Sequence, residues 1–180
     1  MKGEIEAFLR GMNVPEARYT AEKHDPTFHP GRCARVSVGG VDLGCFGQIH
    51  PLAAANYGVD AELYTAELWL GELLAARGAT PVYTPLPRFP AVTRDIAIVC
   101  AADIPVAKLS ACILAAGGQY LKGCELFDVY TGAPIPVGYK SVAFSLTLRA
   151  DDQTLTDDHA EETMQSVLKA LKETFNATIR

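Results

Sequence analysis

The sequence predicts an α+β protein made of two folded parts, and two observations predict it. Residues 76–90, ARGATPVYTPLPRFP, contain four prolines. Proline restricts its neighbours and removes backbone donors, so this segment is expected to be an extended connector. On both sides of it, segments with two-residue alternation of apolar side chains are interspersed with segments of helical periodicity. We expect residues 1–76 to form one part, 77–88 a proline-rich linker and 89–180 the second part.

The composition is that of a globular protein, with 49% hydrophobic and 21% charged residues in a chain of 180. No apolar run is long enough to cross a bilayer, and the first residues have no secretory-signal pattern, so no membrane partner is expected. The five cysteines include no C-x-x-C pair. They are expected to be reduced thiols, which indicates a cytoplasmic protein. The net charge of −5 means that RNA binding would have to rest on a local surface.

The first part reads as a mixed α/β module. It opens with an amphipathic helix that places Ile5, Phe8, Leu9 and Met12 on one face. Two apolar segments then flank Gly39-Gly40, which is typical of a two-residue hairpin turn. A short helix beginning at Pro51, a strand over 62–70 and a short helix over 71–76 complete it.

The second part has a regular order of elements. It is predicted to contain strands over 92–100, 124–130 and 139–149, helices over 106–116 and from the N-cap Thr156 onward, and a short last strand over 176–180. This order, β-α-β-β-α-β, is that of a ferredoxin-like sandwich, with both helices on one face of the sheet. The other face is expected to be open.

Alternation assigns side chains to the two faces. The residues expected to point to the helices are Ile96, Ile98, Phe127, Val129, Val142, Phe144, Leu146 and Leu148. Those expected on the open face are Asp95, Ala97, Val99, Leu126, Asp128, Tyr130, Ser141, Ala143, Ser145, Thr147 and Arg149. This face is small and polar with one aromatic ring, so its pattern alone is compatible either with an ordinary solvated sheet or with a platform for an unpaired base.

The chemistry of a base platform is specific. An ionised carboxylate only accepts hydrogen bonds, and the Watson–Crick edge of guanine offers two adjacent donors, N1–H and the N2 amino group. Asp128 could accept from both and reject adenine, whose N1 is an acceptor. The Tyr130 ring could stack on the base, and the Ser141 hydroxyl could add one hydrogen bond.

Several motifs of the second part resemble one known family. The runs FPAVTRD, LFDVYTG, GYKS and TLTDD, in this order, are similar to the anticodon-binding domain at the C-terminus of bacterial phenylalanyl-tRNA synthetase beta subunits. In the first part, FHPGRCARV and GCFGQIHP resemble the end of the degenerate class II synthetase-like module of the same subunit. On this resemblance the chain is expected to be a fragment of a longer subunit.

The resemblance implies roles for four residues. Asp128 would contact the first anticodon base, a guanine in phenylalanine tRNA, Tyr130 would stack on it, Ser141 would make a polar contact, and Ala97 would pack against it. It further implies a phenylalanine-specific tRNA and the alpha subunit of an α2β2 synthetase as partners. ATP and Mg would be used by the whole enzyme, whereas this chain alone is expected to bind no cofactor, to have no catalytic residue and to be inactive.

Two alternative functions remain open from the sequence. A ferredoxin-like enzyme of acylphosphatase type would need an arginine phosphate cradle and an asparagine on the sheet, and Arg94 is the one candidate for the first. A module that only docks on a partner subunit is also compatible. The spacing of His24, His29 and His50 fits no metal-site pattern, so no metal is expected, and His29 and His50, each before a proline, are expected to shape turns.

Overall fold

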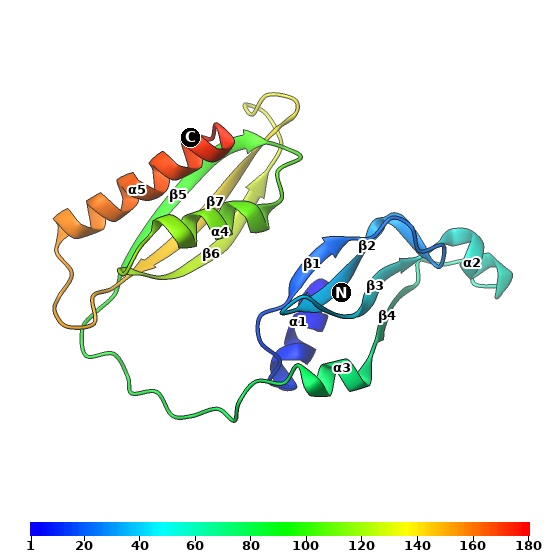
Figure 1. The fold of residues 1–180 in the computed structure, drawn as a ribbon. Coiled ribbons are helices and arrows are strands. Elements are labelled where there is room, and N and C mark those ends of the chain that lie inside the picture. The colour runs from blue at the N-terminus through cyan, green and yellow to red at the C-terminus, as the bar shows by residue number, and fades with distance from the viewer. The chain divides into compact units, whose positions relative to one another are not determined.

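A computed structural model describes all residues from 1 to 180, and the chain divides into two compact units. Unit 1 is Met1–Tyr83 and unit 2 is Thr84–Arg180 (Figure 1). No helix or strand lies between Ala75 and Val92. The start of this connecting segment is bound to unit 1, because the Asn13 amide donates to the carbonyls of Gly78 and Ala79 at 3.1 and 2.8 Å. No helix is both long and apolar enough to cross a membrane.

Unit 1 is a four-stranded antiparallel meander with three short helices. Its elements are α1 (Lys2–Gly11), β1 (Arg18–Ala21), β2 (Phe28–Val38), β3 (Val41–Ile49), α2 (Pro51–Asn56), β4 (Tyr64–Leu68) and α3 (Leu70–Ala75). Gly39 and Gly40 join β2 to β3 with positive φ angles of 58° and 88°, which confirms the predicted hairpin turn. The prediction did not include β1.

A small core joins the first and third helices of unit 1 to the sheet. Ile5 and Leu9 of α1 and Leu73 of α3 are buried against Val36, Leu43 and Phe46 of the strands. The sheet covers the predicted apolar face of α1 only in part, because Ile5 and Leu9 are buried whereas Phe8 is 46% exposed. Helical periodicity groups residues on one side of a helix, but the width of the buried stripe depends on how much of that side the sheet covers.

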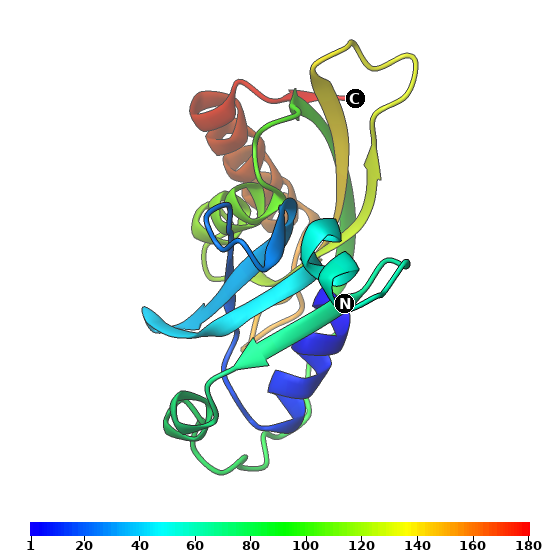
Figure 2. The same ribbon diagram turned by 90° about the vertical axis from the view of Figure 1, so that its right-hand side faces the viewer.

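Unit 2 has the predicted β-α-β-β-α-β order. Its elements are β5 (Val92–Ala101), α4 (Val106–Ala116), β6 (Leu121–Tyr130), β7 (Tyr139–Leu148), α5 (Asp157–Phe175) and β8 (Thr178–Ile179). The strands lie in the order β6-β7-β5-β8, all antiparallel, and α4 and α5 cover the same face (Figures 1 and 2). This is the ferredoxin-like arrangement.

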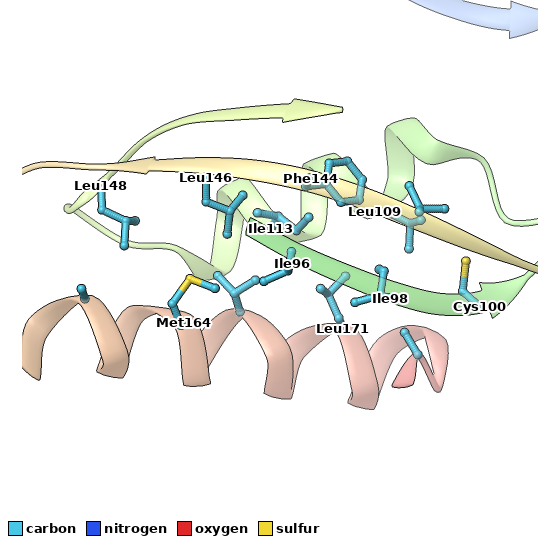
Figure 3. Close-up of a cluster of buried hydrophobic side chains, with 14 of the residues drawn as sticks. Ile96, Ile98, Cys100, Leu109, Ile113, Phe144, Leu146, Leu148, Met164 and Leu171 are labelled. Atoms are coloured by element: carbon cyan, nitrogen blue, oxygen red, sulfur yellow. The ribbon is translucent and has the colours of Figure 1, made fainter. Parts of the chain in front are cut away.

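The core of unit 2 lies between the sheet and these two helices (Figure 3). Ile98, Phe144, Leu146 and Leu148 of the strands are at most 1% exposed and face apolar side chains of the helices, such as Leu109 and Leu171. The Thr156 hydroxyl accepts from the His159 backbone N–H and caps α5, as predicted. Because this core lies between the sheet and α4 and α5, the face of the sheet that packs on these helices is covered and the other face is open.

One strand departs from the predicted alternation. Phe127 has no partner on β7, because the pairing steps from Leu126–Phe144 directly to Asp128–Ala143, which is a β-bulge. Leu126 therefore pairs with a helix-side residue, and its predicted place on the open face is wrong. Val129 pairs with the core residue Val142, so its predicted side is confirmed, although it is 45% exposed because β6 is the edge strand of the sheet. Phe127, also expected to point to the helices, lies at the bulge and is 58% exposed.

Candidate nucleic-acid interface

The open face of unit 2 is ordered in rows by the strand register, since residues paired across an antiparallel sheet share a face. In one row Asp128 pairs with Ala143, which pairs with Ala97. In the next row Tyr130 pairs with Ser141. The structure thus brings together all four residues that the sequence singled out, from three different strands.

The bulge in β6 is what aligns Asp128 and Tyr130 with this face. Both follow Phe127, and both pair with open-face residues of β7. Their side chains are exposed, the Tyr130 ring to 40%. Two residues apart on one strand, they lie about 7 Å from each other along β6. A carboxylate and an aromatic ring are therefore offered side by side to a planar ligand.

Ala97 and Ala143 form the floor beside Asp128. Methyl side chains leave room for a flat ring to approach the sheet. Ser141 lies next to this floor but is only 3% exposed. A ligand that approaches the open face would therefore meet Asp128 and Tyr130 before it meets the Ser141 hydroxyl.

The Tyr130 ring has a defined position against the loop that follows it. Its hydroxyl donates to the Ala133 carbonyl at 2.8 Å, within the loop that joins β6 to β7. Gly132 of this loop leaves space for the ring, since a Cβ built there would lie 2.4 Å from the tyrosine oxygen. The Tyr130 ring is therefore held in place by Gly132 and Ala133, which follow it in the chain.

Sequence reasoning missed Arg180. Its guanidinium carbon lies 5.7 Å from the centre of the Tyr130 ring, a cation–π contact on the open face. A short strand over 176–180 was predicted, but the residues opposite it were not. The alternation of that strand could have indicated part of this arrangement, because Thr178 and Arg180 are two residues apart and must lie on the same face of the sheet.

The features considered for other functions have structural roles. The Arg94 guanidinium, the candidate for a phosphate cradle, is paired with Asp157 at 3.2 Å. The only asparagine of unit 2, Asn176, ends α5 in a left-handed conformation. His29 accepts from the Gly31 N–H and His50 from the Leu52 N–H, so both histidines shape turns, as predicted.

Comparison with known proteins assigns both units. Residues 87–180 match the family described as "Ferredoxin-fold anticodon binding domain", and residues 1–70 match "Phenylalanyl tRNA synthetase beta chain CLM domain". The chain is similar over its whole length to proteins named phenylalanine–tRNA ligase beta subunit. That of Symbiobacterium thermophilum is 41% identical, with 96% of this chain and 19% of the relative covered.

Two further relatives agree with this similarity. The proteins of the same name from Clostridium acetobutylicum and Bacillus subtilis are 38% and 39% identical over 180 residues, which covers all of this chain and 23% and 22% of the relatives. The chain thus spans about a fifth of the length of the curated relatives that it matches. By its fold, its open sheet face and these matches, the chain belongs to the ferredoxin-fold anticodon-binding domain family and is a homologue of phenylalanine–tRNA ligase beta subunits.

Proposed function

We propose that the open face of unit 2 binds the anticodon loop of phenylalanine tRNA and reads its first base. The observation that carries this proposal is the joint placement of Asp128 and Tyr130 beside the floor of Ala97 and Ala143. The chain would act in the cytoplasm within a phenylalanine–tRNA ligase, alongside an alpha subunit in an α2β2 assembly. ATP and Mg would serve that whole enzyme.

In this function the Asp128 carboxylate accepts from N1–H and from the N2 amino group of guanine. An adenine at the same position presents its N1 lone pair to the carboxylate, and the two acceptors repel each other. The Tyr130 ring stacks on either base, because every base has a π face. Selectivity thus comes from the carboxylate, and affinity comes in large part from the ring.

The test compares two anticodon stem-loop RNAs that carry guanine or adenine at the first anticodon position. Affinity for the 180-residue chain is measured at one fixed salt concentration. The Asp128→Asn variant replaces one acceptor oxygen by a donor that faces a guanine donor. It should lose about 1–3 kcal/mol of binding to the guanine RNA and with it the preference over adenine.

Two controls define this experiment. Asp152→Asn removes the same charge from an exposed loop residue outside the sheet and should leave the preference unchanged. Tyr130→Ala should weaken both RNAs together, by about 1–3 kcal/mol, because stacking tolerates any base. An unchanged guanine preference in Asp128→Asn would show that another group reads the base.

A further inference from the structure

The end of β8 adds a fourth residue to the row that contains Asp128. Thr178 and Ile179 pair with Val99 and Ile98, and the Arg180 N–H donates to the Ala97 carbonyl at 2.9 Å. Arg180 therefore lies opposite Ala97 and shares its face. The row crosses the whole sheet, with a carboxylate at one end, two alanines in the middle and a guanidinium at the other end.

The Arg180 guanidinium is available to a ligand. It has no hydrogen bond and no ion pair in the structure, and the side chain is exposed. Its one defined contact is with the Tyr130 ring at 5.7 Å, which holds the charge over the open face. Backbone pairing to Ala97 fixes the position of its Cα. The Arg180 guanidinium is therefore held beside the Tyr130 ring and has no anionic partner.

The two ends of the row match the two edges of guanine. Guanine carries donors at N1 and N2 on one edge and acceptors at O6 and N7 on the adjacent edge. A guanidinium donates to O6 and N7 through two parallel N–H groups, the commonest base-specific contact of arginine. Adenine has an amino donor in place of O6 and repels the guanidinium there. Three strand spacings separate the Asp128 and Arg180 backbones by about 14 Å, a span that a purine and the two side chains can fill.

We propose that Arg180 is a second specificity-determining residue, which donates to O6 and N7 of the first anticodon guanine while Asp128 accepts from N1 and N2. This inference rests on the proposed function of the open face. Two oppositely charged side chains would then form hydrogen bonds with one base in its plane, and the Tyr130 ring would stack on one of its faces. Such a pair requires both edges of guanine, which no other standard base presents.

The test removes the N7 acceptor from the RNA. Affinity of the 180-residue chain is measured for stem-loops with guanine, 7-deazaguanine or adenine at the first anticodon position. The unsubstituted chain should bind the 7-deazaguanine RNA several-fold more weakly than the guanine RNA. Arg180→Ala should lose about tenfold or more on the guanine RNA and clearly less on the 7-deazaguanine RNA.

Two variants separate the hydrogen bonds from the charge. Lys169→Ala removes one positive charge from an exposed position of α5, on the helix side of the sheet. It should change the affinity for the guanine and the 7-deazaguanine RNA by the same factor. Arg180→Lys keeps the charge but lacks the planar fork, so it should recover part of the affinity without the dependence on N7.

The outcomes distinguish the two proposals. If the unsubstituted chain does not prefer guanine to adenine, the proposed function of the face is overturned. If it does prefer guanine but binds 7-deazaguanine equally well, Arg180 is not a reader and the assignment of Asp128 stands. An equal loss on all three RNAs in Arg180→Ala would reduce the residue to a general attraction for phosphate and would overturn the inference.

Discussion

Tyr130 owes its position to a residue without a side chain. The ring lies against Gly132, and its hydroxyl is held by the Ala133 carbonyl. A glycine in this place is a packing requirement, since the nearest atoms to an added Cβ are the tyrosine oxygen and ring carbons at 2.4, 2.7 and 3.2 Å. The position of the ring that we propose to stack on the base therefore depends on Gly132, a loop residue outside the proposed contact surface.

We expect Gly132→Ala to push the Tyr130 ring out of place and to weaken RNA binding to a similar extent as Tyr130→Ala, about 1–3 kcal/mol, with guanine and adenine RNAs affected alike. Affinity measurements with both RNAs check this. Gly123→Ala, in the neighbouring strand β6, is the matched control, because a Cβ there meets Thr147 at an ordinary contact distance of 3.6 Å. Full affinity in Gly132→Ala would show that the ring need not hold this position to bind.

At the scale of elements, the bulge in β6 determines which of its side chains lie on the open face. In a regular strand Leu126 and Asp128 would lie on the same face of the sheet, and their partners on β7 would be two residues apart. The structure pairs them with the successive residues Phe144 and Ala143. Bulges are common at sheet edges and beside binding sites, where they redirect side chains. Here the bulge places an apolar residue toward the helices and the carboxylate toward the open face.

In unit 1 a carboxylate joins the end of β1 to β2. Glu22 accepts from the backbone N–H groups of Lys23 and His24 at 2.8 and 2.7 Å and from the Arg35 Nε at 2.8 Å. The His24 backbone hydrogen bond, followed by the bonds from Arg35 and Lys23, lowers the pKa of Glu22 to about 2. These bonds need the ionised form. We therefore expect the connection between the two strands to weaken when Glu22 is protonated.

A depressed pKa contributes stability above the pKa of the unfolded chain, about 4.5, and this contribution is lost as the pH falls through the folded value. We expect Glu22→Gln to lower the stability of unit 1 at pH 7, and the difference from the unsubstituted chain to vanish as the pH falls from about 4.5 to 2. Urea unfolding across this range measures it. Glu16→Gln, at an exposed site, should show no such convergence. A constant difference at every pH would contradict this prediction.

At the scale of the whole molecule, the net charge of −5 opposes binding to RNA phosphates. In the proposed function, recognition would then come mainly from contacts with one or a few bases, because an acidic surface can neutralise few phosphates. This agrees with a proposed site that rests on the Tyr130 ring, the Asp128 carboxylate and the Arg180 guanidinium. It also agrees with the proposed function, in which the rest of a larger enzyme would supply affinity for the tRNA.

The salt dependence of binding should therefore be shallow. Each neutralised phosphate of a single strand contributes about 0.7 to the slope of log K against log salt, so we expect a slope with a magnitude below about 3. A titration with the guanine stem-loop at several salt concentrations measures it. Arg180→Ala should reduce the slope by less than about 1, since its main contact is with the base. A slope typical of a strongly basic protein would place the RNA on another surface.

The sequence by itself determined the elements of unit 2 and the membership of the open face at Ala97 and Ser141. Local rules suffice there: α4 lies at the predicted residues 106–116, and alternation assigns β5 and β7 correctly because neither strand contains a bulge. These features depend on residues that are close in the chain. Asp128 and Tyr130 were also predicted on this face, but their orientation depends on a bulge that alternation did not predict.

The tertiary structure alone decided the bulge at Phe127, the exposure of Phe8 and the place of Arg180. Each depends on a partner far away in the sequence: β7 for the bulge, the sheet of unit 1 for Phe8, and Ala97 and Tyr130 for Arg180. A period of two residues states which side chains share a face of one strand, but not which residue of another strand lies opposite. Register between strands is set by packing across the whole sheet, and the proposed guanine site is a property of that register.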